Sequence, residues 1–214
     1  MHVVLRSRFA EDRLAAAVVR GITQYVILGA GFDTFVLRQP PWARSLRIFE
    51  VDHPGTQEEK RSRLSAAGLA MPENEAFADI DFENEPLLAG LGRHHIGINQ
   101  PTFFSWLGVT MYLKEEAIDA VLQSVGAFPP GSEIVLTIAS QTNEAHALIA
   151  KHAAGIGEPW VSCFEPDDFA AKLTGTGFSK VGFLSTEEAE ARYFSKGHGE
   201  LPVPNASHIL FAVV

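Results

Sequence analysis

The chain has 214 residues, 46% of them hydrophobic, and a formal net charge of −9 at pH 7. This length and apolar content are enough for a single domain over residues 1–214, and no shift in composition divides it. The acidic balance argues against a nucleic-acid partner, and the sequence lacks a long apolar run or signal-peptide core, so we expect no membrane partner and a cytoplasmic location.

Strands and helices alternate along the chain. The predicted helices cover residues 8–20, 54–69, 85–91, 114–128 and 142–154, and a further helix begins at 165. The predicted strands cover 25–29, 46–52, 76–80, 134–138, 181–184 and 209–214, and a buried strand with its following turn covers 102–113. This alternation predicts an α/β fold with a seven-stranded, mostly parallel, Rossmann-like sheet and helices on both faces. The long excursion over 185–208 predicts an antiparallel last strand.

The spacing of apolar and polar residues predicts which side of each helix is buried. In the helix over 114–128, one face carries Ile118, Val121, Leu122 and Val125. In the helix over 54–69, the polar run that includes Gln57 and Lys60 is expected on the solvent side.

A glycine turn follows the first predicted strand. Gly29 and Gly31 have no Cβ, so the backbone can turn sharply here and approach a ligand closely. A dinucleotide site has a third small residue where this chain has Thr34. Asp33 places a carboxylate in the turn, which would repel a pyrophosphate by roughly 1–4 kcal/mol. The loop therefore favours S-adenosyl-L-methionine, which has no phosphate and carries cationic groups, over NAD and an oxidoreductase function.

Acidic residues close the second predicted strand. Asp52 lies 21 positions after Gly31, a spacing that fits the acid that hydrogen-bonds ribose hydroxyls in Rossmann-like folds. Glu50 and Asp52 share a strand face, so either could reach the sugar. We favour Asp52 because it stands at the strand end, beside the turn that Pro54 begins. The alternative is that both acids are solvated strand-end charges.

Several segments taken together resemble the leucine carboxyl methyltransferase family, including bacterial O-methyltransferases similar to those of polyketide biosynthesis. They are residues 6–9, 28–38, 49–54, 79–80, 110–113 and 164–178, and the resemblance covers nearly the whole chain. It implies a class I methyltransferase fold and S-adenosyl-L-methionine as cofactor. It also implies methyl transfer to a carboxyl or hydroxyl oxygen of a small-molecule acceptor, with a protein C-terminus as the less favoured acceptor.

The resemblance implies roles for five residues around the methionine and ribose portions of the cofactor. Arg6 would pair with the methionine carboxylate, since a guanidinium binds that group through two parallel hydrogen bonds. The alternative for Arg6 is a surface arginine. Gly29 and Gly31 would line the homocysteine portion, and Asp33 would lie near its cationic end. Asp52 would hold the ribose.

The resemblance places two further residues at the adenine. Asp79 would accept a hydrogen bond from the adenine amino group. The N–H group of Ile80 would meet a ring nitrogen, and its side chain would pack on the base. The position of Tyr112, after the fourth predicted strand, favours a catalytic role in which it faces the transferring methyl group or orients the acceptor. A core or interface tyrosine is the alternative.

Two departures from the family pattern favour a second interpretation. The relatives usually carry a glutamate where this chain has Leu107, and the chain begins almost at the arginine-rich motif, so we expect a short or missing N-terminal lid segment. A catalytically incomplete, cofactor-binding module is therefore the alternative function. The histidines show no metal-ligand spacing, and the single cysteine, Cys163, is typical of a reducing compartment. We expect no metal site.

Overall fold

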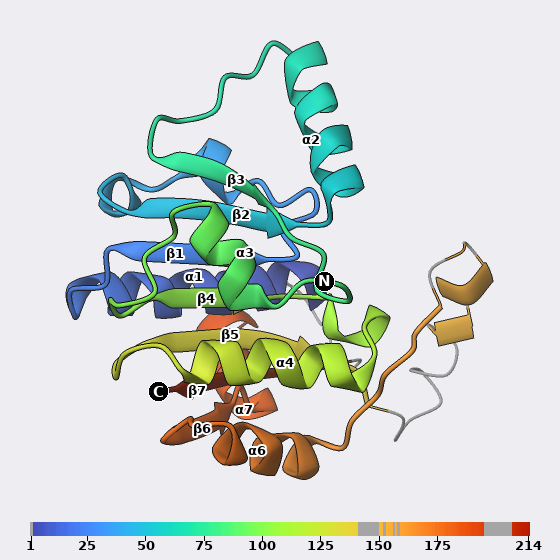
Figure 1. Cartoon of the computed structure of the whole chain (residues 1–214). Helices are drawn as coiled ribbons and strands as arrows, with labels where there is room; N and C mark the ends of the chain where they lie inside the picture. The colour runs from blue at the N-terminus through green and yellow to red at the C-terminus, as the bar shows by residue number, and fades with distance from the viewer. Residues whose placement is uncertain (1, 141–149, 152, 156, 158, 195–206) are drawn as a thin grey trace.

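The computed structural model describes residues 2–140, 150–151, 153–155, 157, 159–194 and 207–214. Its centre is a seven-stranded sheet with strand order β3-β2-β1-β4-β5-β7-β6 (Figure 1). The strands are β1 (Gln24–Leu28), β2 (Arg47–Asp52), β3 (Glu75–Asp79), β4 (Phe103–Trp106), β5 (Glu133–Ile138), β6 (Lys180–Phe183) and β7 (His208–Val213). The first five strands run parallel, and β7 lies antiparallel between β5 and β6. The predicted fold class and the reversed last strand are confirmed.

Helices cover both faces of this sheet (Figure 1). They are α1 (His2–Val19), α2 (Pro54–Ala66), α3 (Leu87–Arg93), α4 (Glu115–Gly126), α6 (Pro166–Gly175) and α7 (Thr186–Ala189). Short turns of 3₁₀ helix form η1 (Phe35–Arg38), η2 (Pro41–Ala43) and η3 (Thr110–Tyr112), and a π turn forms η4 (Glu190–Phe194). Among the described helices, none is long and apolar enough to cross a membrane.

Two apolar clusters hold the layers together. One packs α3, α4 and α6 against one face of the sheet, and the other packs α1, η1, η2 and α7 against the opposite face. Every residue of β1 and β5 is buried, as expected of parallel strands covered on both sides. The face of α4 predicted from its apolar spacing is the buried face.

Two helices differ from the prediction. Helix α1 begins at His2, earlier than predicted, because Leu5 extends the buried stripe formed by Phe9 and Leu14. Arg6 therefore lies on a helix. The predicted helix over 142–154 falls mostly outside the described residues. The described part of the 185–208 excursion contains α7 and η4.

Candidate functional site

A cavity of about 380 Å³ opens at the carboxyl ends of β1 and β4. The strand order reverses between these two strands, and α/β sheets bind ligands in the crevice at such a point. The cavity has a volume typical of small-molecule sites. Its lining comes from the start of α1 and from the loops after β1 and β4, and it includes Arg6, Gly29, Gly31, Asp33, Leu107 and Gly108.

The loop after β1 needs its two glycines for different reasons. Gly29 and Gly31 have φ values of 64° and 48°, a region that favours glycine. A Cβ on Gly29 would also lie 2.3 Å from Cγ2 of Val109, so the loop after β4 packs directly on this residue. A Cβ on Gly31 would have no described atom within 4 Å. The backbone is therefore tightly packed at Gly29 and accessible at Gly31.

Asp52 fastens this loop to the end of β2. Its Oδ2 accepts a hydrogen bond from the N–H group of Gly31 at 2.5 Å, and its Oδ1 accepts one from the N–H group of His53 at 2.7 Å. A carboxylate has about four acceptor positions, so two remain for hydroxyl groups of a ligand. Ribose binding by Asp52 stays a prediction, and the geometry leaves room for it.

Glu50, the alternative to Asp52, is fully buried. Its Oε2 lies 2.5 Å from Nζ of Lys60. Burial raises the pKa of the Glu50 carboxyl to about 7, although the charge of Lys60 opposes that rise. The strand therefore turns Glu50 into the fold and leaves Asp52 as the acid that reaches the surface.

Asp33 lies in the same loop and is the acid among the described residues that line the cavity. Its Oδ1 accepts a hydrogen bond from the N–H group of Phe35 at 2.6 Å, which fixes the start of η1. Its carbonyl oxygen accepts a hydrogen bond from Nζ of Lys60 at 2.8 Å. The carboxylate thus keeps a defined orientation beside the cavity.

Arg6 enters the cavity from the first turns of α1. Its guanidinium lies over Gly108, where a Cβ would be 2.3 Å from Nη1, and Gly108 has a φ of 78°. Burial lowers the pKa of Arg6, while nearby Tyr112 and Asp33 oppose that change. No described residue forms a hydrogen bond or ion pair with this guanidinium. A partly buried cation of this kind is a good binding group for a carboxylate.

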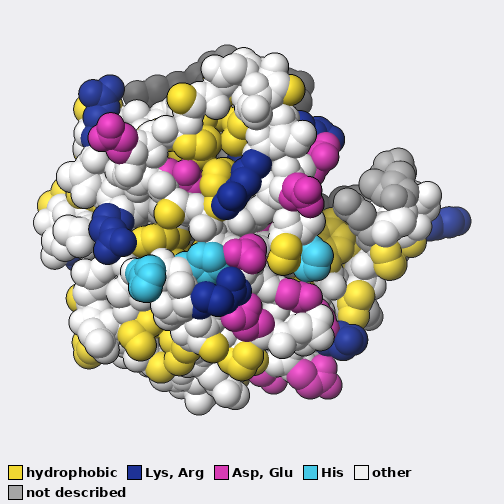
Figure 2. Space-filling view, turned by 45° about the horizontal axis from the view of Figure 1, so that its top comes forward, with side chains coloured by type: hydrophobic (Ala, Val, Ile, Leu, Met, Phe, Trp, Pro, Cys, Tyr) yellow, Lys and Arg dark blue, Asp and Glu magenta, His cyan; other side chains and the backbone are white. Residues whose placement is uncertain are grey.

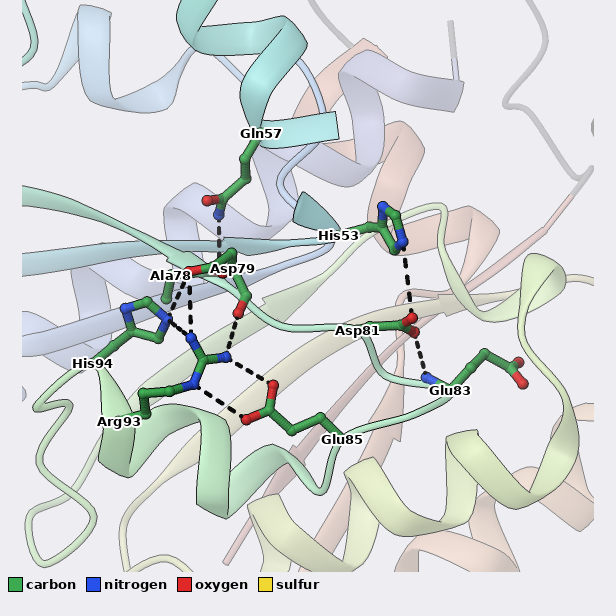
Figure 3. Close-up of polar contacts among 9 residues, drawn as sticks. All are labelled: His53, Gln57, Ala78, Asp79, Asp81, Glu83, Glu85, Arg93 and His94. Atoms are coloured by element: carbon green, nitrogen blue, oxygen red, sulfur yellow. Dashed lines mark hydrogen bonds and ion pairs between the residues drawn. The ribbon is translucent and has the colours of Figure 1, made fainter. Parts of the chain in front are cut away.

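Asp79 ends β3 directly beside Asp52, its partner in the sheet. Its Oδ1 lies 3.5 Å from Nη1 of Arg93 and 3.0 Å from Nε2 of His94, and Figure 3 shows the three side chains converging. Nη2 of Arg93 donates to the carbonyl oxygen of Asp79 at 2.7 Å and to Glu85 at 2.8 Å. The side chain of Asp79 is 47% exposed, so it remains accessible to a ligand.

The same region of the surface mixes charges of both signs. Figure 2 shows acidic, basic and histidine side chains close together on one face. Among the described residues, no group of three His, Cys, Asp or Glu side chains has the arrangement of a metal site.

Ile80 does not take the position expected of it. Its N–H group donates to the carbonyl oxygen of Asp52 at 2.9 Å as part of the sheet. Its side chain is 1% exposed and packs on Gly90, where a Cβ would lie 2.6 Å from Cδ1. Both groups expected to meet the adenine are therefore engaged within the fold, and we do not retain this contact.

Tyr112 lies at the end of η3 and is 40% exposed, which excludes the core alternative. It is close enough to Arg6 to affect the pKa of the guanidinium. It is not among the residues that line the cavity around the glycine loop. A catalytic role for Tyr112 stays a prediction.

Three residues at or next to this site were not predicted from the sequence: Gly108, Gln57 and Lys60. Gly108 follows a fully buried strand, and a glycine in that position is a usual signal of a close backbone approach. Gln57 and Lys60 were expected in solvent, but each is 4% exposed. That expectation was wrong because both side chains have buried polar partners across the sheet, which apolar spacing cannot indicate.

Known proteins resemble this chain in sequence. Residues 1–126 match the model of the leucine carboxyl methyltransferase family. The Bacillus subtilis protein "Putative S-adenosyl-L-methionine-dependent methyltransferase YktD" is 35% identical over 97% of this chain and 71% of its own length. SCO7813 of Streptomyces coelicolor, with a name of the same kind, is 32% identical over 88% of this chain and 66% of its own length. The chain thus spans about two thirds of these relatives.

Solved structures agree on the fold. A DUF574 family protein from Streptomyces avermitilis superposes with a TM-score of 0.68. The match covers 97% of this chain and 82% of that one, at 16% sequence identity. At this level of identity the similarity establishes a shared architecture and nothing about the acceptor.

Proposed function

The chain belongs to the leucine carboxyl methyltransferase family, and on that premise we propose that it transfers the methyl group of S-adenosyl-L-methionine to a carboxyl or hydroxyl oxygen of a small molecule. One observation carries the proposal. The guanidinium of Arg6, without a hydrogen-bonding partner among the described residues, lies in the same cavity as Gly29, Gly31 and Asp33. A cation, an open backbone and an acid in one small cavity match the carboxylate and the ammonium of the methionine portion.

The rest of the cofactor would extend beyond the lining of this cavity, toward Asp52 and Asp79. Asp52 keeps two acceptor positions for the ribose hydroxyls, and Asp79 presents an accessible carboxylate for the adenine amino group. Leu107 stands where relatives usually carry a glutamate, so Asp33 is the acid left to pair with the ammonium. The carboxylate of Asp33 would also repel a pyrophosphate, which disfavours NAD.

The bound cofactor would supply a methyl group on a positively charged sulfur. An oxygen nucleophile would attack this methyl group from the side opposite the sulfur, which leaves. The chain's own part is alignment and exclusion of water. Leu107 and Val109 would provide an apolar wall beside the sulfur, and Arg6 would fix the methionine portion. A carboxylate acceptor is already ionised at neutral pH and needs no base. With a hydroxyl acceptor, a general base would raise the rate of methyl transfer by about 10²–10⁴-fold. Tyr112 would then orient the hydroxyl group.

A second candidate function is cofactor binding without methyl transfer. The apolar Leu107 favours it, because this side chain cannot replace the charge that relatives usually have there. Both candidates require the same cofactor site, so they differ in transfer and not in binding.

Calorimetry with S-adenosylhomocysteine and with NADH tests the site first. We expect binding of S-adenosylhomocysteine and none of NADH, and no binding of S-adenosylhomocysteine at millimolar concentration would reject both candidates. Release of label from methyl-labelled cofactor is then measured across a panel of carboxylic acids and phenols. Transfer to any of them supports the enzyme, whereas tight binding without transfer across the panel favours the binding module.

A further inference from the structure

Helix α2 meets the sheet through polar side chains. Its two buried residues are Gln57 and Lys60, three positions apart and therefore on one face of the helix. Lysine is almost never fully buried unless it has partners, and each burial of this kind costs desolvation energy. An apolar pair would pack a helix on a sheet without that cost. Packing alone therefore does not explain why this pair is polar.

The partners of Lys60 lie on two different elements. Its Nζ lies 2.5 Å from Oε2 of Glu50, which is fully buried on β2. It also donates to the carbonyl oxygen of Asp33 at 2.8 Å, in the loop after β1. One ammonium group thus connects α2 and β2 with the loop that lines the candidate cofactor cavity.

Gln57 fixes the position from which Lys60 reaches. Its Nε2 donates to the carbonyl oxygen of Glu50 at 2.7 Å and to that of Ala78 at 2.8 Å. Figure 3 shows Gln57 descending from α2 onto β3 just before Asp79. Gln57 therefore bonds α2 to both β2 and β3, and Lys60 bonds the same helix to the glycine loop.

We propose that Lys60 is a positioning residue for the cofactor: its ammonium group holds the Asp33 carbonyl and thereby keeps the loop from Gly29 to Asp33 in the shape that receives the methionine portion. The inference rests on the proposed cofactor site. Glu50 pairs with the ammonium group and orients it, and Glu50 is not among the residues that line the cavity. Replacing a buried ion pair by apolar residues is often neutral for stability, so the pair is explained better by geometry than by stability.

The test separates this role from folding. Lys60→Met alone would leave Glu50 buried without its partner, so the main variant is Glu50→Leu with Lys60→Met, which removes both charges. The matched control is Glu58→Leu with Arg61→Met, which removes an exposed acid and an exposed base on the same helix. Arg61 stacks on Phe77 of β3. We expect both double variants to melt near the wild-type temperature. The affinity for S-adenosylhomocysteine should fall about 10-fold or more in the first variant and stay at the wild-type value in the control.

A conservative variant separates the role of the Lys60 ammonium group from that of the Glu50 charge. Glu50→Gln keeps Lys60 and its hydrogen bond to Asp33, so the affinity for S-adenosylhomocysteine should stay near the wild-type value. If Glu50→Leu with Lys60→Met does not fold, Glu50→Gln with Lys60→Gln replaces it with the same expectation. A folded variant without the ammonium group that binds S-adenosylhomocysteine like the wild type would overturn the proposal.

Amide hydrogen exchange in residues 29–35 of the ligand-free protein tests the inference without the cofactor. Exchange should be faster in the variant that lacks Lys60 than in the wild type and in the Glu58/Arg61 control. Unchanged exchange would contradict a hold on the loop. Faster exchange in a protein whose wild type does not bind S-adenosylhomocysteine would support the role of Lys60 and reject the proposed function.

Discussion

Asp52 serves the fold and the proposed ligand with one carboxylate. Its two oxygens receive the N–H groups of Gly31 and His53, so the side chain fixes the glycine loop and the start of α2. A ligand hydroxyl would bind to the positions that these contacts leave free. Removing the carboxylate therefore affects the ligand directly and through the loop.

We predict that Asp52→Ala weakens the binding of S-adenosylhomocysteine by more than about 1 kcal/mol, because a charged hydrogen-bonding contact is lost. Calorimetry measures the effect, with Glu58→Ala as the control, an exposed acid on α2. Asp52→Asn keeps one acceptor oxygen and should bind with intermediate affinity. An Asp52→Ala protein with wild-type affinity would rule out the ribose assignment.

Glu75 is a partly buried acid on β3 and is not among the residues that line the cavity. Burial is the main reason that its pKa rises to about 7, and the charge of Glu50 adds to the rise. Its Oε1 has no hydrogen-bond partner among the described residues. The folded chain thus keeps a proton on Glu75 that the unfolded chain releases near pH 4.5, so the contribution of Glu75 to stability declines as the pH rises from about 4.5 to about 7.

Glu75→Gln should therefore stabilise the protein at pH 8 and change little at pH 4.5, since glutamine resembles the protonated acid. Urea unfolding at the two pH values measures the difference in the free energy of unfolding. Glu73→Gln, a change to an exposed acid nearby, should have no such pH dependence. An equal effect of Glu75→Gln at both pH values would contradict the raised pKa.

At the scale of elements, the site is formed by one helix and two loops that meet at the cavity. Helix α1 brings Arg6, the loop after β1 brings Gly29 and Gly31, and the loop after β4 brings Gly108 under the guanidinium. Each loop is shaped by a glycine whose backbone another side chain would disturb. The loop after β4 is held in turn by Thr137, whose Oγ1 accepts the N–H group of Gly108 at 2.7 Å.

Gly108→Ala should displace Arg6 and weaken the binding of S-adenosylhomocysteine at least 10-fold, because the new Cβ would lie 2.3 Å from Nη1. The matched control is Gly131→Ala, which has a φ of 91° but no described atom within 4 Å of its Cβ position. Both variants carry backbone strain, so calorimetry separates the displacement of Arg6 from that strain. Equal affinities in the two variants would contradict the placement of Arg6.

The elements that the sequence predicted well are those whose evidence is local. The apolar runs of β1 and β5, the stripe on α4 and the glycine turn at Gly29 and Gly31 are each visible in a short window. The buried face of α2 was predicted wrongly, because the partners of Lys60 lie outside the helix, in β2 and in the loop after β1. The family resemblance assigned the N–H group of Ile80 to a ligand, whereas its hydrogen bond to the carbonyl oxygen of Asp52 cannot be read from the sequence.

At the scale of the molecule, the sheet joins two halves. The strands β1 to β5 run parallel, with the cavity at the ends of β1 and β4, whereas β7 and β6 complete the sheet on the other side. Leu210 is fully buried where these halves meet, opposite Leu136 on β5 and Phe183 on β6. Its contribution belongs to the shared core and not to the cavity.

Leu210→Ala should lower the free energy of unfolding by about 2–5 kcal/mol, the usual cost of such a cavity in a core. The folded fraction should keep its affinity for S-adenosylhomocysteine. Thermal unfolding and calorimetry measure the two quantities, with Val19→Ala as the control, since Val19 is 89% exposed. A loss of affinity as large as that expected of Asp52→Ala or Gly108→Ala would show that the two halves of the sheet are not independent.

The insertion of β7 between β5 and β6 also sets an order for biosynthesis. Among the described strands, β6 hydrogen-bonds to β7 alone, so it has no neighbour until the last strand has left the ribosome. The strands that frame the ligand crevice have all been synthesised by the end of β5. In a nascent chain the strands around the ligand crevice can therefore pair before β6 pairs with β7, and a ligand present during translation would meet those strands first.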